Sequence, residues 1–435
     1  MKKAVLLAPY FLPRRRVGSW RPFKFAIHLK KYGWEPHVFT IRETRNTLTA
    51  KEKAFLSDIA VHEIKSPFDF THRLNNGYAY SGFSNKKNAS GPSPKFTPAK
   101  SIINWIDKQI PIDSWLPLFI YRKRYLEKLM AKINPDILWS TGDPWSSHWM
   151  GKELTNNLDI PWIADFRDPW TLGNVNLKNR SGFSFSMDKK EEEKVLKNAS
   201  MLTFNARKTE ELYQKKYRDY DIKSSTIYNC FDSSLFDDKN SAESLFDEEF
   251  LNLVFFGKFR PLSPAAPFLE LLEWLYKYNA EAASKVRMYC FGSLSKEEEL
   301  YARKKNLFKN FIPLKQIPLE EALPILSRAD ILWLSTHPSR KYIVPSKLWD
   351  YLAAKRPILS VAPNSEISKI LKKTGAGVQL SSDPSSIAKL IIDCMAAKER
   401  KHSMPIPVKF DHQVIKQYDA PVATKKLANI FDGLI

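Results

Sequence analysis

The chain has 435 residues, 43% of them apolar and 26% charged, so it is long enough for two domains and does not have the composition of a disordered protein. Lys and Arg outnumber Asp and Glu by 68 to 47, and the formal charge of +21 favours nucleic acid, an anionic membrane face or phosphorylated molecules as partners. The three cysteines, Cys230, Cys290 and Cys394, are too few and too widely spaced for a disulfide framework or a metal site, and they indicate a reducing compartment such as the cytoplasm.

The N-terminus carries an apolar run at residues 4–8 that imitates the start of a signal peptide. Pro9 and Pro13 interrupt this run, three arginines follow at 14–16, and no small-residue cleavage site appears. We therefore predict a buried first strand. The sequence has no stretch of 18 apolar residues, so we expect no membrane span.

In the first half of the chain, short apolar runs alternate with longer helical patterns, which is typical of a parallel sheet covered by helices. Apolar residues at helical spacing predict a helix over 23–32 that ends at Gly33. Six strands are predicted here, at 4–8, 37–41, 137–140, 162–165, 201–205 and 225–228.

A second βα series follows an acidic, serine-rich segment without a clear period, which predicts an interdomain linker at 231–249. Its strands are predicted at 253–256, 287–291, 331–335, 358–361 and 377–380. The fold class is thus α/β, with two Rossmann-like domains, 1–230 and 250–410, facing each other across a cleft that is the default site. We expect the final helical stretch, 411–435, to pack back on the first domain.

Residues 66–117 break this pattern. Between Asp69 and Asp107 the segment has no acidic residue, and its Lys and Arg residues lie among Tyr, Phe and Trp. Two interpretations stay open: a mobile surface insertion, or a basic-aromatic element that contacts anionic lipid headgroups or a lipid-phosphate acceptor.

Ligands of doubly wound sheets bind at the carboxyl ends of strands, and the loop after the first strand is the first candidate. Gly18 allows a close approach of the backbone to a ligand, Arg16 and Ser19 flank it, and a following helix start favours anions. A basic turn with one glycine is also common in proteins without a ligand. The absence of a G-x-G-x-x-G pattern disfavours a nicotinamide cofactor.

Two acidic loops follow later strands. Asp143 lies in the turn after the strand at 137–140, and the loop at 165–170 reads Asp-Phe-Arg-Asp-Pro-Trp. Arg167 is able to pair internally with Asp165, which would leave Asp168 facing the cleft to accept sugar hydroxyls. The spacing of Asp165 and Asp168 is not typical of a metal site, and no His or Cys accompanies them, so we expect no metal.

The segment 344–354 is the fourth candidate for ligand binding. Pro345 and Ser346 are good helix-start residues, and the free N–H groups of such a start, with Lys347, would hold a diphosphate. Asp350 lies one turn further and would accept from a ribose diol. An ordinary capped helix would have a similar sequence.

Several segments together resemble one family, the GT-B glycosyltransferases of the group-1, family-4-like type. The markers, in order, are Gly18-Ser19, the loop 165–170, and residues 345–353, which read Pro-Ser-Lys-Leu-Trp-Asp-Tyr-Leu-Ala. Residues 227–232 are similar to the family's interdomain segment, with Cys230 in place of Gly, and 255–260 to the first strand and phosphate loop of its donor domain. The similarity spans most of the chain apart from 66–117.

The resemblance implies a retaining, metal-independent transfer from a nucleotide sugar to a glycan or lipid-linked acceptor, as in polysaccharide or glycolipid biosynthesis. On this basis the donor diphosphate would meet a set of donor-domain residues, namely Gly257, Lys258, Arg260, Ser346 and Lys347. Asp350 matches the second Glu of the family's E-x7-E pattern, which binds ribose. Tyr342 stands where the first Glu is usual, and Pro264 stands near the place of the second basic residue of the phosphate loop.

The chemistry divides the candidates into two groups. Cations and helix N–H groups would stabilise the negative charge on the leaving diphosphate. Asp143 or Asp168, with Arg167, would stabilise the positive charge on the sugar or orient the acceptor hydroxyl. The tryptophans are expected in the core and the cleft wall, with stacking of Trp145 or Trp170 on a sugar face as the alternative. His148 is predicted inside a helix with a structural role.

Three alternatives stay open beside the transferase. A sugar-nucleotide epimerase shares the fold and the phosphate-binding parts but needs no acceptor. A non-catalytic GT-B-like scaffold would fit the presence of Tyr342 at the position where the family usually has Glu. Nucleic-acid binding would fit the charge, but the basic residues are spread over both halves and no nucleic-acid module appears. We expect a cytoplasmic protein with no nucleic-acid partner, and peripheral contact with the inner membrane face stays open.

Overall fold

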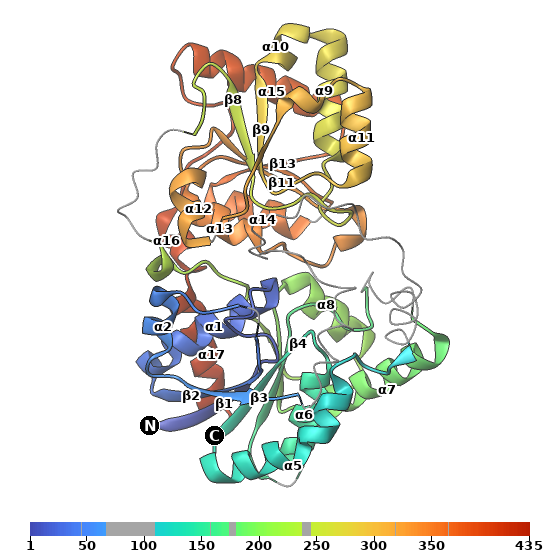
Figure 1. Cartoon of the computed structure of the whole chain (residues 1–435), viewed down its shortest axis with the longest axis vertical. Coiled ribbons are helices and arrows are strands. Elements are labelled where there is room, and N and C mark those ends of the chain that lie inside the picture. The colour runs from blue at the N-terminus through green and yellow to red at the C-terminus, as the bar shows by residue number, and fades with distance from the viewer. Residues whose placement is uncertain are drawn as a thin grey trace. The chain divides into compact units, whose positions relative to one another are not determined.

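The computed structural model describes residues 1–44, 46–66, 109–156, 158–173, 180–236, 245–317, 319–363 and 365–435. The chain forms two compact units (Figure 1): unit 1 comprises Met1–Tyr228 and Ala420–Ile435, and unit 2 comprises Asn229–Asp419. Most of the basic-aromatic segment predicted at 66–117 lies outside the described residues. Within the described ranges, no helix has both the length and the apolar character needed to cross a bilayer.

Unit 1 is built on a seven-stranded sheet with the order β3-β2-β1-β4-β5-β6-β7, in which every pair is parallel. The strands are β1 (Lys2–Leu7), β2 (Trp34–Ile41), β3 (Ala60–Ile64), β4 (Ile137–Gly142), β5 (Trp162–Phe166), β6 (Met201–Phe204) and β7 (Ser224–Thr226). The register places Ala4 of β1 between Pro36 and Ile137. All six predicted strands are present, and the edge strand β3 is additional.

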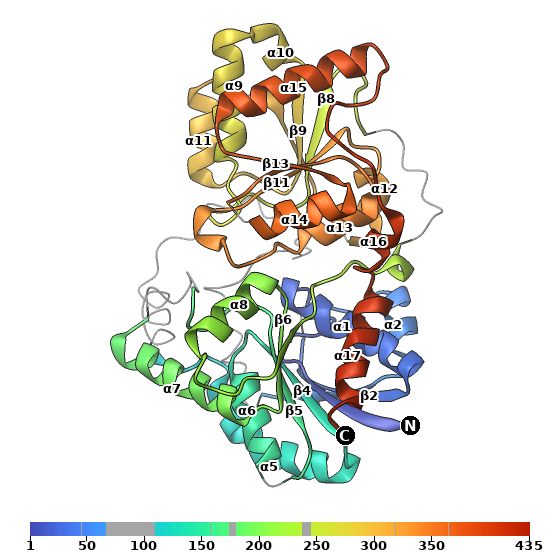
Figure 2. The same ribbon diagram turned by 180° about the vertical axis from the view of Figure 1, so that it is seen from behind.

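Helices cover both faces of this sheet (Figures 1 and 2). One face carries α1 (Val17–Leu29), α2 (Ala50–Leu56) and α17 (Ala420–Asp432), and the other carries α5 (Leu116–Ile133), α6 (Ser146–Thr155), α7 (Gly182–Asn198) and α8 (Arg207–Lys216). α1 starts six residues before the prediction, and Gly33, at φ +85°, ends the short 3₁₀ turn that follows it.

The C-terminal helix α17 packs beside α1, and the two chain ends lie close together (Figure 2). Trp34 and Phe431 contact with their rings edge to face at 5.0 Å, and Lys2 pairs with Asp432 at 2.9 Å. The predicted segment 411–435 divides between the units, because α16 (His412–Lys416) belongs to unit 2 and α17 to unit 1.

Unit 2 has a six-stranded parallel sheet with the order β10-β9-β8-β11-β12-β13. Its strands are β8 (Leu251–Phe255), β9 (Val286–Phe291), β10 (Phe311–Leu314), β11 (Ile331–Ser335), β12 (Ile358–Val361) and β13 (Gly377–Leu380). The last three have the predicted bounds, and β10 is an additional edge strand.

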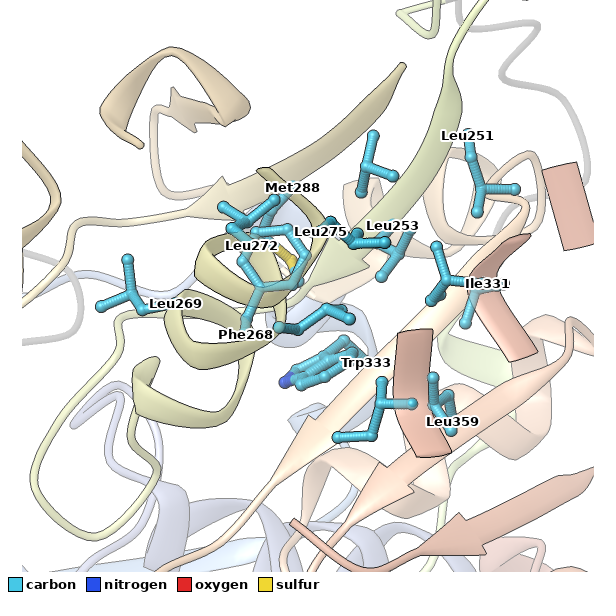
Figure 3. Packing of buried hydrophobic residues seen from close by; sticks show 14 of the residues in the cluster. Leu251, Leu253, Phe268, Leu269, Leu272, Leu275, Met288, Ile331, Trp333 and Leu359 are labelled. Carbon is cyan, nitrogen blue, oxygen red and sulfur yellow. The ribbon is translucent and has the colours of Figure 1, made fainter. Parts of the chain in front are cut away.

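The helices of unit 2 also lie on both faces of its sheet. α9 (Ala266–Tyr278), α10 (Ala280–Ser284), α11 (Lys296–Lys304) and α15 (Pro384–Glu399) form one layer, and α12 (Leu319–Leu326), α13 (Lys347–Ala354) and α14 (Ser365–Thr374) form the other. Figure 3 shows the core beneath α9, where Phe268 meets Trp333 edge to face at 5.6 Å. This packing fixes the strands whose carboxyl ends carry the candidate residues.

The segment predicted as a linker, 231–249, belongs to unit 2 where it is described. Ser233 donates to the Asp419 carboxylate from its backbone N–H at 3.0 Å and from its hydroxyl at 2.6 Å, and Phe231 forms a bridge with Asp419. Residues 237–244 lie outside the described ranges. The chain therefore passes between the units at two neighbouring places, 228–229 and 419–420.

Candidate functional site

The central strands of unit 2 create a switch point, because β8 and β11 are neighbours while the chain continues from them toward opposite edges of the sheet. Ligands of doubly wound sheets bind beyond the carboxyl ends of such strands. Two loops leave this point, 256–265 after β8 and 336–346 after β11. The His337 N–H donates to the Leu262 carbonyl (3.2 Å) and joins the two loops, and the hydroxyl of Ser335, the last residue of β11, donates to the Pro264 carbonyl (2.7 Å).

Gly257 and Lys347 meet at this switch point. Gly257 has φ +123°, which side chains disfavour, and a Cβ atom there would lie 3.2 Å from Cε of Lys347. The Lys347 ammonium lies 4.7 Å from the centre of the Phe255 ring. The absence of a side chain at 257 thus leaves room for the lysine against the strand end.

Lys347 lies in a cationic environment. Burial, together with the charges of Arg260 and Arg340, lowers the pKa of Lys347 to about 8, while Asp350 acts in the opposite direction. In the described part of the chain, neither Lys347 nor Lys258 forms a salt bridge. A bound anion would relieve this accumulation of positive charge.

Lys258 belongs to the same neighbourhood. Burial raises the pKa of the Cys290 thiol to about 12, and the charges of Lys347 and Lys258 oppose this effect. The Cys290 thiol donates to the Gly257 carbonyl at 3.2 Å. Gly292, at φ +155°, lets the β9 loop approach Lys258 closely, since a Cβ there would lie 2.9 Å from its Cα.

α13 begins at the edge of this cluster. Ser346 precedes its first residue, and among the described residues the Ser346 hydroxyl makes no capping bond. Asp350 lies in the first turn. The helix is held by Tyr351, whose hydroxyl accepts from the Phe256 N–H at 2.9 Å and donates to the Trp333 carbonyl at 3.1 Å.

Arg340 is a site residue that was not predicted from the sequence. It ends a 3₁₀ turn after β11 (Pro338–Arg340), and its charge acts on Lys347. The available signal was the basic pair Arg340-Lys341 in the loop after a predicted strand. Tyr342, at the expected Glu position, is half-buried, and the Lys341 ammonium lies 5.1 Å from its ring centre.

Unit 1 has its own switch point between β1 and β4, and there the structure assembles four of the predicted residues. The Arg167 guanidinium lies against Gly18, where a Cβ would be 2.6 Å from Nη1. Arg167 forms ion pairs with Asp143 and, at 3.5 Å, with Asp168. The arginine side chain is 10% exposed, that of Asp143 50% and that of Asp168 29%, so the carboxylates form the accessible part of the group.

The alternative in which Arg167 pairs with Asp165 is wrong. Asp165 is fully buried and accepts a bidentate pair from Arg21, at 2.8 and 3.0 Å. The hydroxyls of Thr141 and Thr203 also donate to it, at 2.8 and 2.7 Å. Because these donors occupy the Asp165 carboxylate, Arg167, beyond the end of β5, pairs with Asp143 and Asp168 instead.

Two further residues of the first loop have local structural contacts. Ser19 is fully buried, and its hydroxyl donates to the Arg14 carbonyl. The Arg16 guanidinium donates to the Tyr10 hydroxyl at 3.0 Å and lies over the Tyr10 ring. Gly18 instead lies against Arg167.

The aromatic residues near these loops are buried. Trp145 and Trp170 are 4% and 0% exposed and stack on each other at 5.2 Å, so their expected place in the core is confirmed and the alternative of stacking on a sugar is wrong. His148 lies in α6, as predicted, and its Nδ1 shares a hydrogen bond with the Ser140 hydroxyl at 2.8 Å. Burial lowers the pKa of His148 to about 3, which keeps the ring neutral and excludes it as an accessible base.

The described residues contain no group of three or more His, Cys, Asp or Glu side chains suited to a metal ion. No protein-family model and no curated protein sequence matches the chain.

Solved structures match the chain over its whole length. Sucrose-phosphate synthase from Thermosynechococcus elongatus is 12% identical, with a TM-score of 0.68 over 100% of this chain and 99% of that one. HepE of Anabaena, in complex with UDP and glucose, is 12% identical with a TM-score of 0.61 over 100% of both chains. A putative UDP-N-acetylglucosamine 2-epimerase from Listeria monocytogenes is 9% identical, with a TM-score of 0.54 over 98% of this chain and 95% of that one.

At this level of identity the likeness concerns the fold. The chain has the two-domain GT-B fold, in agreement with the fold class expected from its sequence.

Proposed function

We propose that the protein is a glycosyltransferase that moves a sugar from a nucleotide-sugar donor, bound by unit 2, to a glycan or lipid-linked acceptor. The observation that carries this proposal is the cationic cluster of Lys347, Arg260 and Arg340 at the switch point of unit 2. It combines three features of a diphosphate site: fixed positive charge, a glycine that permits close approach, and a helix start.

The cluster suits the chemistry of sugar transfer. When the bond between the anomeric carbon and the diphosphate breaks, negative charge develops on the leaving phosphate oxygens. Lys347 and its neighbouring arginines would stabilise that charge without reorganisation, because α13 and the two loops already hold them in position. Removal of one such donor typically reduces the rate by about 10²- to 10³-fold.

The same helix offers a place for the nucleoside. Asp350 follows Lys347 by one turn, so a diphosphate at the start of α13 would bring the ribose hydroxyls near this carboxylate. Tyr342 replaces a carboxylate expected in the family resemblance, and we propose that its hydroxyl meets the donor sugar instead. The retaining outcome and the independence from a metal rest on the resemblance of the sequence motifs.

On unit 1, the accessible carboxylates of Asp143 and Asp168 are the candidates for contact with the acceptor hydroxyl or the reacting sugar. Arg167 lies between them and would hold both in a fixed orientation. The cytoplasm is the proposed compartment, because Cys230, Cys290 and Cys394 are all buried free thiols.

The comparisons support a sugar nucleotide and favour UDP as the first one to test, since HepE was solved with UDP, with UDP and glucose, and with UDP-glucose. A lipopolysaccharide outer core galactosyltransferase, WaaB, also shares the fold at a TM-score of 0.55. The epimerase alternative has a structural match as well, so release of the nucleoside diphosphate must be measured separately from binding. An epimerase returns the nucleotide sugar intact.

The test is calorimetric titration with UDP, GDP, ADP and TDP, followed by measurement of nucleoside diphosphate release from the corresponding sugar derivatives. We expect one nucleotide to bind, and Lys347→Ala to weaken it at least tenfold, because charge-assisted hydrogen bonds contribute about 1.5–3 kcal/mol. Lys389→Ala, which removes an exposed lysine on α15, is the matched control and should bind like wild type. Failure of all four nucleotides to bind would contradict the proposal, and binding without release would favour the scaffold or the epimerase.

A further inference from the structure

The helix α5 in unit 1 has two very different faces. Its inner face packs into the core of unit 1 through apolar side chains, which are Leu118, Phe119, Leu126, Met130 and Ile133. Six of the side chains exposed on the opposite face are here called the α5 outer face: Ile120, Tyr121, Arg124, Tyr125, Lys128 and Lys132. None of these six belongs to the candidate sites.

The apolar part of this face is unusually exposed. The side chain of Ile120 is 55% exposed, that of Tyr121 61% and that of Tyr125 44%. Single exposed apolar side chains are normal on a protein surface, but three within six residues of one helix form a patch. Such patches mark contacts with another apolar phase or with a partner.

The charged part of the face has one sign. Arg124, Lys128 and Lys132 are exposed, and the only acidic residue of α5, Glu127, lies at the border of the face, 3.9 Å from Lys123. Lys123 in turn pairs with Glu153 at 2.5 Å. The partner surface must therefore be negatively charged, which also disfavours a second copy of this face.

The two tyrosines are held in place from one side. The Arg122 guanidinium lies 5.0 Å from the Tyr121 ring centre and 6.0 Å from that of Tyr125. The same guanidinium donates to the Lys65 carbonyl at 2.7 Å, which fixes it to the end of β3. The rings are thus oriented before any partner binds.

We propose that the α5 outer face docks on an anionic lipid bilayer. Tyrosines are enriched at the membrane–water interface, an isoleucine gains by entering the acyl boundary, and exposed cations meet the lipid phosphates. A soluble polyanion would use the cations but gains little from an exposed isoleucine. The inference goes beyond the proposed function, because it concerns where the protein acts and uses none of the donor-binding residues.

Helix α11 of unit 2 provides an internal contrast. Leu300 is 69% exposed and Tyr301 40%, so their apolar exposure resembles that of α5. The preceding residues are three glutamates, Glu297, Glu298 and Glu299, which an anionic surface repels. The two helices therefore have similar apolar exposure but opposite charge, so a comparison of them tests whether the positive charge is needed for binding.

The experiment is flotation of the full chain with vesicles of phosphatidylcholine alone or mixed with phosphatidylglycerol. Wild type should float with the anionic vesicles only. Ile120→Ser/Tyr121→Ser and Arg124→Glu/Lys128→Glu should each weaken that binding about tenfold or more, since each cation near the surface contributes about 1 kcal/mol. Leu300→Ser/Tyr301→Ser is the matched control and should float like wild type.

Circular dichroism of each variant verifies that it folds, and UDP titration verifies that the donor site is unchanged. Equal flotation of wild type and both α5 variants would overturn the proposal, as would no flotation of wild type. The proposal would also be overturned if only the charge variant loses binding, or if Ile120→Ser/Tyr121→Ser loses binding to a single-stranded oligonucleotide to the same extent as to vesicles. Either result would indicate a polyanion site in place of a bilayer contact.

Discussion

Lys347 combines a buried position with a charge that a phosphate ligand requires. Its pKa of about 8 arises from burial and from the neighbouring charges of Arg260 and Arg340. An anion beside the ammonium favours the charged form, so ligand binding must raise this pKa. Protonation of Lys347 and binding of a diphosphate are therefore linked.

This linkage predicts a pH dependence. Below pH 8 the ammonium is present in the free protein and the affinity for the nucleoside diphosphate is at its maximum. As the pH rises through 8, binding requires uptake of a proton, and the affinity falls by up to about tenfold per pH unit. Titration calorimetry from neutral to mildly alkaline pH measures this slope.

Lys347→Arg is the matched variant for this measurement, because arginine stays charged over the whole range. Its affinity should be nearly constant with pH. A wild-type slope that persists unchanged in Lys347→Arg would assign the titration to another group and remove Lys347 from the diphosphate contact.

The individual site residues differ in how far the sequence alone could predict them. The Pro-Ser-Lys segment and Gly257 have recognisable spacing, and the structure brings Lys347 and Gly257 together. Arg340 has no motif around it, because its role depends on how the loop after β11 folds against the loop after β8. The partner of Arg167 could not be predicted either, because the pairing with Asp143 requires two loops that are 24 residues apart in sequence to meet.

At the level of elements, the ion pair between Arg21 and Asp165 ties α1 to the end of β5. Both side chains are almost fully buried, and the hydroxyls of Thr141 and Thr203, from β4 and β6, complete the shell of the carboxylate. Loss of one partner leaves a buried charge without compensation, which typically costs about 3–5 kcal/mol.

We therefore expect Asp165→Asn to lower the free energy of unfolding of unit 1 by about 3 kcal/mol or more. Urea denaturation, followed separately for the two units, measures this free energy of unfolding. Asp159→Asn, an exposed carboxylate ahead of the same strand, should change the value by less than about 0.5 kcal/mol. A loss below about 1 kcal/mol in Asp165→Asn would mean that the pair does not hold α1 to the sheet.

Every central strand was predictable from the sequence, and so were the edge strands β7 and β13, whereas the edge strands β3 and β10 were not. β11, β12 and β13 are short apolar runs with turn residues on both sides, and their bounds are confirmed. β3 is half-buried along most of its length, and β10 contains Pro313, so neither shows the continuous apolar run of a buried strand. Such strands form because a neighbouring strand provides the hydrogen-bonding partners.

At the scale of the whole molecule, each unit has a parallel sheet with one switch point, and the two switch points differ in character. That of unit 2 gathers cations around Gly257, and that of unit 1 gathers two accessible carboxylates around Arg167. The alternation of strands and helices predicted two such domains, because each βα pattern is local in sequence. The division of the segment 411–435 between the units was not predictable, because it depends on which unit each short helix contacts.

We propose that unit 2 holds the donor diphosphate at the carboxyl ends of β8 and β11. Hydrogen–deuterium exchange with and without the nucleotide that binds locates it most directly. We expect exchange to slow in peptides covering 256–263 and 336–350, and we expect Lys347→Ala to lose this protection while Lys389→Ala keeps it. Unchanged exchange in both segments at saturating nucleotide would contradict the assignment of the donor to unit 2.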